Sequence, residues 1–282
     1  MRPVGHSSDF TLEVDPITTK FDNLYVESCR AAEELYSLKQ GKFHILYSGG
    51  IDSEHCLSVF LSLGMEVTPV IIKLTQGYND HDTKFAFKFC EEKNLKPIVI
   101  DIDYDNFIES GKMLQISQEM KSSTFARAHI AYAAGLLDGT VILGDGEPYI
   151  KLNPDNKVWY LEEAEHDFSV YNYFQKHGIH GTVHYTRWTQ GMNAAYMTDP
   201  IMLKLANNQL PGKLSSHSSR PTIYNRHSNF DLKPRYKFHG FEFRNQHEIF
   251  KHPDFAELEK DAITYNGQYS IPYHNFIKKC IL

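Results

Sequence analysis

Residues 43–53 constrain the fold of this chain more than any other segment. A largely apolar run at 43–47 is followed by the glycine pair Gly49 and Gly50, and a polar group then opens a helix-like pattern. This order predicts a strand, a tight turn and a helix. Backbone N–H groups of a glycine-rich turn at a helix N-terminus converge on one small volume, where the helix dipole favours negative charge. The segment therefore predicts a phosphate-binding turn.

Strand-like and helix-like segments alternate through the first half of the chain. Apolar runs predict strands at 43–47, 67–74, 97–102 and 140–143, and helical spacing predicts helices at 53–63, 82–93, 107–120 and 125–137. The succession of Val70, Ile71 and Ile72 is typical of a strand that is buried on both faces. Gly111 is expected to interrupt the helix at 107–120. The alternation predicts an α/β fold with a doubly wound, mostly parallel sheet.

The character of the sequence changes after residue 150. We expect residues 1–40 to form an N-terminal arm and a helix at 21–39, residues 41–150 an α/β core that carries the phosphate-binding turn, and residues 151–282 a mainly helical region packed on that core. In this last region the sequence predicts a hairpin turn at 153–156, helices at 168–177, 200–207, 255–265 and 275–282, and a polar loop at 215–226.

Composition excludes several classes of function. The net charge of −6 gives no electrostatic reason to expect non-specific nucleic-acid binding. The four cysteines are scattered without a Cys-x-x-Cys pair, so neither a disulfide framework nor a zinc knuckle is indicated. There is no apolar leader and no apolar run of about 18 residues, so we expect a cytoplasmic protein that does not enter a membrane.

A second glycine-bearing turn follows the fourth predicted strand. It comprises Gly144, Asp145, Gly146 and Glu147. Ligands of doubly wound sheets bind beyond the carboxyl ends of the strands. Because both turns follow strands at their carboxyl ends, we expect them to face one crevice.

The residues Ser48-Gly49-Gly50-Ile51-Asp52-Ser53 resemble the Ser-Gly-Gly-x-Asp-Ser signature of the PP-loop ATP pyrophosphatases. No lysine follows the glycines, so the turn is not a Walker loop. The resemblance implies a sheet like that of the HUP, or adenine nucleotide alpha-hydrolase-like, proteins. It also implies that the turn holds the pyrophosphate part of ATP while a substrate attacks the α-phosphorus. The alternative is a glycine turn that only tightens the packing of strand and helix.

The chemistry of the loop assigns a role to each residue type. Gly49 and Gly50 let backbone amides approach phosphate oxygens, and the hydroxyl groups of Ser48 and Ser53 offer further donors. The Asp52 carboxylate would repel a polyphosphate, so its predicted role is to bind Mg²⁺, which prefers oxygen ligands and bridges to phosphates.

The second turn resembles the Gly-x-Gly loop of the asparagine-synthetase-like branch. The resemblance predicts that Gly144, Asp145 and Gly146 contact the nucleotide, and that Asp145 or Glu147 supplies a second metal ligand. Pro148 stands where that branch usually has an acidic residue. An ordinary acidic surface turn is the alternative.

Four cationic residues are further candidates for the site. Arg127 is placed to reach a phosphate or a substrate carboxylate, with an exposed helical arginine as the alternative. Lys237 lies among aromatic residues and is predicted to stabilise charge at the α-phosphate. Lys73, on the strand expected to border the adenine, and Lys151 rank behind Lys237 for that role.

These expectations combine into an ATP- and Mg²⁺-dependent enzyme that adenylates a small substrate, releases pyrophosphate and passes the substrate to an amine or ammonia. The expected branch lacks a glutaminase domain, since Arg2 and not cysteine follows Met1, so the amine would come free or from a partner. A nucleotide, or a nucleic acid that undergoes modification, is an alternative substrate. The sequence is compatible with an oligomeric protein.

Two alternatives remain. A sulfonucleotide (PAPS-type) reductase or sulfur-transfer enzyme would need a reactive cysteine, for which Cys280 is the candidate, although neighbouring Lys278 and Lys279 replace the expected Glu-Cys-Gly pattern and helix packing is the simpler role. The other alternative is a nucleotide-binding protein without turnover.

Overall fold

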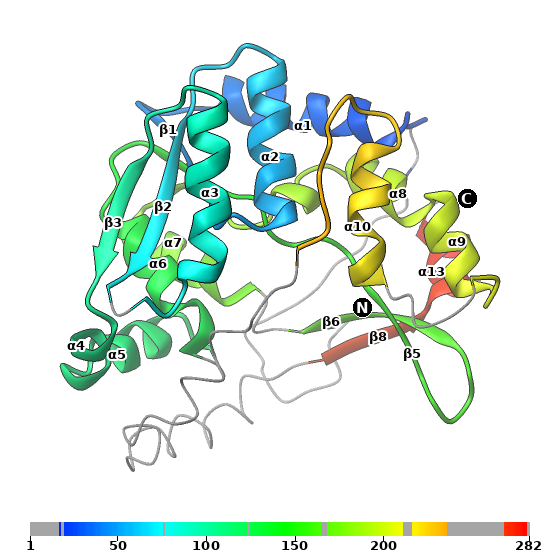
Figure 1. The fold of residues 1–282 in the computed structure, drawn as a ribbon. Coiled ribbons are helices and arrows are strands. Elements are labelled where there is room, and N and C mark those ends of the chain that lie inside the picture. The colour runs from blue at the N-terminus through cyan, green and yellow to red at the C-terminus, as the bar shows by residue number, and fades with distance from the viewer. Residues whose placement is uncertain are drawn as a thin grey trace.

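The main sheet has five parallel strands in the order β3-β2-β1-β4-β7 (Figure 1). The computed structural model describes residues 17, 20–75, 77–122, 125–164, 168–210, 216–235 and 268–280. The strands are β1 (Phe43–Leu46), β2 (Thr68–Leu74), β3 (Ile98–Ile102), β4 (Thr140–Leu143) and β7 (His180–Thr182). The predicted α/β fold is confirmed, because this is a Rossmann-like parallel sheet of the kind found in HUP proteins.

Helices cover both faces of this sheet. One face packs against α1 (Leu24–Ser37), α2 (Ile51–Ser62) and α3 (Asp80–Glu92), and the other against α4 (Tyr104–Glu109), α5 (Lys112–Glu119), α6 (Ala128–Gly135) and α7 (Ser169–His177). Successive residues of β1 divide between the two faces, with Ile45 in the first core and Leu46 in the second. As predicted, Gly111 separates α4 from α5, and the short 3₁₀ helix η1 (Phe125–Arg127) leads into α6.

The fifth strand, β7, was not predicted. It pairs with β4 so that Thr140 lies beside His180 and Ile142 beside Thr182. The strand is three residues long and has a glycine at its centre, so its sequence carries no apolar, β-branched run. The second half of the chain thus completes the sheet of the first half.

A small antiparallel sheet lies apart from the main one (Figure 1). Its order is β5-β6-β8, formed by β5 (Ile150–Leu152), β6 (Trp159–Ala164) and β8 (Gln268–Pro272). The predicted hairpin between β5 and β6 is confirmed, and the Asn153 Oδ1 atom accepts hydrogen bonds from the backbone N–H groups of Asp155 and Asn156. The chain ends its described part in α13 (Tyr273–Cys280), which follows β8 directly.

In the part of the chain that the structure describes, four helical segments lie between β7 and β8. These are the 3₁₀ helix η3 (Tyr185–Arg187), then α8 (Gln190–Met197), α9 (Pro200–Ala206) and α10 (Ser216–Asn225). The predicted loop at 215–226 was wrong, because nearly all of this segment is α10 even though it contains Pro221. Burial of Ile223 and Tyr224 against the main core outweighs the low helix propensity of the serine- and proline-containing sequence. The helix predicted at 255–265 lies outside the described residues.

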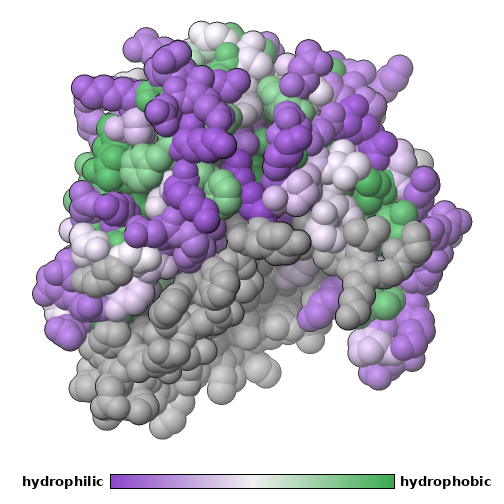
Figure 2. Space-filling model, in the orientation of Figure 1, coloured by the Kyte–Doolittle hydropathy of each residue, from purple (hydrophilic) through white to green (hydrophobic). Residues whose placement is uncertain are grey.

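The surface of the described residues is mostly hydrophilic on the face drawn in Figure 2. Hydrophobic atoms gather on the side where β3 lies, and β3 is an edge strand with Ile98 37% and Val99 40% exposed. Among the helices of the described ranges, none is both long and apolar enough to cross a bilayer.

Candidate functional site

The two glycine-bearing turns meet where the strand order of the sheet reverses. From β1 the chain continues to β2 and β3 on one side, whereas β4 and β7 lie on the other. Leu46 and Leu143, the last residues of β1 and β4, lie side by side in register. The segments that follow, 47–53 and 144–147, therefore start at the same level of the sheet. This is the switch point at which ligands of such folds bind.

The first turn is held tightly against its surroundings. Gly49 has a φ of 82°, and a Cβ at this position would lie 2.3 Å from the carbonyl oxygen of Asp82 in α3. The Ser48 and Ser53 hydroxyl groups lie 3.1 Å apart, and Ser48 Oγ also accepts from the N–H of Gly50 at 3.2 Å. The two serines brace the turn in this structure, and their role as phosphate donors stays a prediction.

Helix α2 begins at the end of this turn. Its N-cap is Gly50, and no described side chain caps it. The first turn of a helix carries amide N–H groups without partners inside the helix, and the dipole adds partial positive charge at the same end. The start of α2 therefore offers a binding place for an anion.

The second turn touches the first. A Cβ at Gly144 would lie 2.6 Å from the Cα atom of Ser53, so only a glycine allows the two backbones to come this close. The Arg187 guanidinium donates to the backbone oxygens of Gly146 and of Glu147, the latter at 3.4 Å, and so supports the turn from η3.

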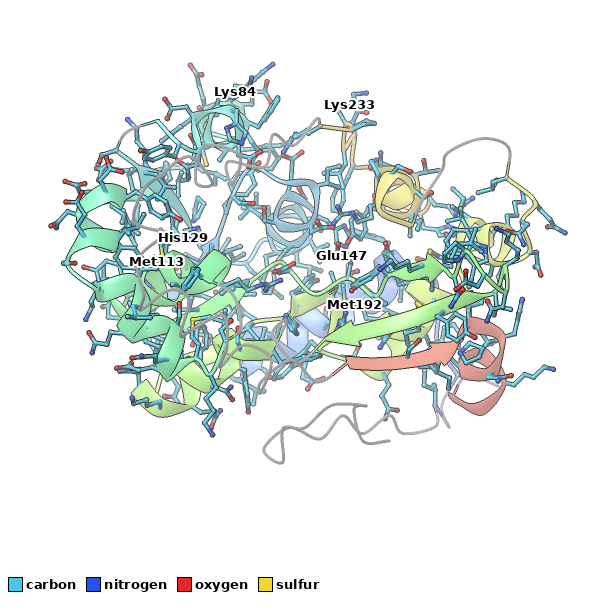
Figure 3. All side chains as sticks on the ribbon, turned by 90° about the horizontal axis from the view of Figure 1, so that it is seen from below. Lys84, Met113, His129, Glu147, Met192 and Lys233 are labelled. Carbon is cyan, nitrogen blue, oxygen red and sulfur yellow. The ribbon has the colours of Figure 1, made fainter. Side chains whose placement is uncertain are left out.

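A cavity of about 460 Å³ opens between the turns. Seven predicted site residues line it, namely Ser48, Gly50, Asp52, Ser53, Arg127, Gly144 and Asp145. The rest of the lining is largely apolar and aromatic and includes Val70, Ile72, Leu74, Tyr78, Tyr104 and Ile130. The cavity thus has a polar end at the turns and an apolar end beyond β2. His129 of α6 also lines it and is labelled in Figure 3.

Arg127 and Asp145 form an ion pair at the polar end. Their Nη1 and Oδ2 atoms lie 2.6 Å apart, and the exposed fractions of the two side chains are 20% and 39%. The predicted cation and one of the predicted metal ligands are therefore partners of each other in this structure.

Arg220 of α10 contacts one carboxylate from each of the two turns. Its Nη1 atom contacts both Asp52 Oδ2 of the first turn and Glu147 Oε1 of the second. The three side chains are only 4%, 10% and 13% exposed. Tyr224, one helical turn after Arg220, donates to Asp52 Oδ1 at 2.8 Å. In Figure 3, Glu147 lies near the middle of the view, between α10 and β6.

The environment of Glu147 favours its protonated form. Burial, together with the smaller effect of the Asp52 charge, raises the pKa of Glu147 to about 8, although the nearby Arg220 acts in the opposite direction. A carboxyl group in this environment gains much from a cation, and the present cation is the guanidinium of Arg220.

Arg235 binds the first turn directly. Its guanidinium donates to the carbonyl oxygen of Gly49 and pairs with Glu54 in α2. Glu54 also accepts a hydrogen bond of 2.6 Å from the hydroxyl group of Tyr47. The Arg235 guanidinium lies 4.9 Å from the ring centre of Phe85 in α3. The conformation of the turn thus depends on a residue from the C-terminal part of the chain.

Some candidates do not join this arrangement. Lys73 is half-buried within β2 and does not line the cavity, and Lys151 is exposed on β5. Lys237 lies outside the described residues. Gly49, Ile51 and Gly146 adjoin lining residues without lining the cavity themselves. Glu147 does not line it either and is linked to the lining residue Asp52 through Arg220.

The carboxylates of the site fit the way in which Mg²⁺ is bound in nucleotide sites. Within the described ranges, no group of three or more His, Cys, Asp or Glu side chains could hold a metal ion. Mg²⁺ in nucleotide sites, however, is usually held by one or two carboxylates together with phosphate oxygens and waters. Asp52 and Glu147, whose oxygens already meet at one cationic nitrogen, match that smaller requirement.

Sequence reasoning missed Arg187, Arg220 and Tyr224. Arg220 and Tyr224 stand four residues apart, which places them on one face of a helix, but the polar sequence of this segment predicts a loop. A predicted helix at 216–225 would have identified both residues as neighbours on one helix face.

Comparison with known proteins adds no relative, since neither a family model nor a curated protein matches the chain.

Proposed function

We propose that the protein binds ATP with Mg²⁺ and activates a carboxylate or carbonyl oxygen of a small substrate as an adenylate. One observation carries the proposal. The Ser-Gly-Gly-x-Asp-Ser turn and the Gly-x-Gly turn line the same cavity at the switch point of a parallel sheet. The start of α2, which no described side chain caps, and the ion pair of Arg127 with Asp145 lie at the same end of the cavity and support the binding of a phosphate together with a cation there.

The lining suggests how the nucleotide is oriented. The amide groups at the start of α2 suit the negatively charged phosphates. The apolar end, with Val70, Ile72 and Tyr78, suits a flat base. In this orientation the α-phosphate lies between the two turns, within reach of side chains from both.

The proposed reaction has two steps. A substrate oxygen attacks the α-phosphorus, the bond from this phosphorus to the β-phosphate oxygen breaks, and pyrophosphate leaves with the electron pair. The nitrogen of an amine or ammonia then attacks the activated carbon, the carbon–oxygen bond to AMP breaks, and the nitrogen loses a proton. The product is an amide, or an amidine when the activated group is an amide carbonyl.

The chain's own residues have separate roles in this scheme. Gly49, Gly50 and the start of α2 bind phosphate oxygens, and Arg127 offsets charge at the same end. Asp52 and Glu147 would hold Mg²⁺, which offsets the charge on the departing pyrophosphate. Lys237 remains a candidate for contact with the α-phosphate.

The test is a product assay. The purified protein is incubated with ATP, MgCl₂ and a panel of small carboxylic acids and amides, with and without ammonium, and the nucleotide products are separated. Equal amounts of AMP and pyrophosphate support the proposal. Release of ADP and phosphate would overturn it, and tight ATP binding without any product would favour a nucleotide-binding protein that lacks turnover.

A further inference from the structure

We infer that Arg220 is a phosphate-binding residue which competes with a divalent cation for the position between Asp52 and Glu147. Because that position is defined by an ATP and Mg²⁺ site, the assignment rests on the proposed function. It concerns a residue of α10 that belongs to neither glycine-bearing turn.

The geometry of the contacts is that of a cation site. Both carboxylates contact the same atom, Arg220 Nη1, and they come from the two different turns. A guanidinium with a purely structural role can bind two carboxylates through different nitrogen atoms. Here a single nitrogen stands where two acidic oxygens converge, which is the arrangement that a small bridging cation requires.

A divalent cation carries the charge that two carboxylates can share. Asp52 and Glu147 both contact the guanidinium of Arg220, whereas Arg127 pairs with Asp145. Arg187 donates to backbone oxygens of the second turn. A divalent cation would balance both carboxylates, so its binding can replace the Arg220 contact without leaving buried negative charge.

Arg220 has a natural second partner close by. Asp52, which it contacts, lies in the first turn of α2, at the end that suits a phosphate. A guanidinium released from the carboxylates would meet phosphate oxygens there, and its planar donors match them better than a lysine would.

The helix need not move for this exchange. Tyr224 continues to bind Asp52 Oδ1, and its ring stacks on the His55 imidazole with 4.2 Å between ring centres. The exchange requires the Arg220 side chain to change its rotamer.

The experiment measures Mn²⁺ alone, without nucleotide, by its paramagnetic resonance signal on titration into the full chain. In Arg220→Met the two carboxylates lose their resident cation, so we expect Mn²⁺ to bind at least about tenfold more tightly than in the parent. Inorganic pyrophosphate, titrated with MgCl₂ present, should bind at least about tenfold more weakly. Arg226→Met is the matched control, since Arg226 lies just after the same helix but pairs with Asp199, and both affinities should match the parent.

A second variant covers the case in which Arg220→Met does not fold. Arg220→Lys keeps the positive charge, so its Mn²⁺ affinity should stay at the parent value while its pyrophosphate affinity falls. Unchanged Mn²⁺ affinity in folded Arg220→Met, or parental pyrophosphate affinity in Arg220→Lys, would overturn the assignment. Failure of the product assay with a normal gain in Mn²⁺ affinity would instead count against the adenylation chemistry alone.

Discussion

The guanidinium of Arg235 donates a hydrogen bond to the carbonyl oxygen of Gly49, a residue 186 positions earlier in the chain. The same guanidinium pairs with Glu54, and both side chains are nearly buried, with 12% and 7% exposed. The first turn is thus held by a cation from the C-terminal part of the chain. Its shape does not depend on the glycine pair alone.

Replacing Arg235 should loosen this turn. Arg235→Met leaves the buried Glu54 carboxylate without its cation, so we expect the free energy of unfolding to fall by about 2 kcal/mol. ATP affinity, measured by calorimetry, should fall about tenfold because the amide groups are no longer held in place. Arg30→Met is the control, since Arg30 is a half-exposed arginine of α1 that pairs with Asp22 and Glu27, neither of which belongs to the two turns. Equal ATP affinities for both variants would contradict the role given to Arg235.

Asp52→Asn tests the proposed metal ligand. The amide has nearly the shape of the carboxylate but no charge, so pyrophosphate release should fall by at least about 100-fold. The control is Asp138→Asn, because Asp138 is 76% exposed and pairs with Lys42 away from the cavity. Turnover of Asp52→Asn at the parent rate would rule out a metal-binding role for this residue.

Gly144→Ala tests the contact between the two turns. The added methyl group would overlap the backbone of Ser53, and separating the turns should cost about 1–3 kcal/mol of stability together with most of the ATP affinity. Gly64→Ala serves as the comparison. A methyl group at this position would meet no atom within 4 Å, but the backbone of Gly64 has a positive φ. We expect it to cost about 1 kcal/mol in a denaturant titration and to leave ATP binding intact. A Gly144→Ala protein with parental affinity would show that the close approach is dispensable.

Stability should decrease in mild acid because of His55. Burial lowers the pKa of this imidazole to about 3 from its ordinary value of 6.5. The unfolded chain takes up a proton below about pH 6.5 and the folded chain only near pH 3, so this contribution is complete above 6.5 and declines as the pH falls. Between pH 7 and pH 5 the loss should be about 2 kcal/mol.

The His55→Phe/Ser28→Ala double variant isolates that contribution. Ser28 Oγ is the hydrogen-bond partner of His55 Nε2 at 3.1 Å, so removing both groups avoids an unpaired buried hydroxyl. Urea titrations at pH 5 and pH 7 should show a smaller difference for the variant than for the parent. An identical pH dependence would mean that His55 does not titrate as its burial requires.

Cys280→Ser separates the ligase from the reductase. Cys280 is the last residue of α13, at the end of the described chain. If the reaction is adenylation followed by attack of an amine, release of AMP and pyrophosphate should be unchanged in this variant. Complete loss of activity in a folded Cys280→Ser protein would favour reductive or sulfur-transfer chemistry.

Local sequence signals sufficed for the first four strands of the main sheet. A buried strand is predicted by the succession of Val70, Ile71 and Ile72 alone, and a turn is predicted by the glycine pair after β1. Residues 180–182 carry no such signal, because a three-residue strand with a central glycine is formed by its pairing with β4 and not by its own propensity. The helix α10 likewise depends on the core that its Ile223 and Tyr224 contact.

The sequence likewise predicted one part of the candidate site and missed another. The residues of the two turns were predicted, because each turn has a local pattern and the sheet topology brings them together. Arg187, Arg220 and Tyr224 were not, because isolated arginines and tyrosines are common on surfaces and only the tertiary structure shows which carboxylate or carbonyl each one meets.

The position of β7 has a consequence for the synthesis of the protein. This strand begins 37 residues after β4 ends, so the ribosome completes the sheet only after a further interval on the order of 2–8 s. Until then β4 presents a row of unpaired backbone groups along one side. A nascent chain that stalls before residue 180 would therefore offer this edge to any other unfinished chain nearby.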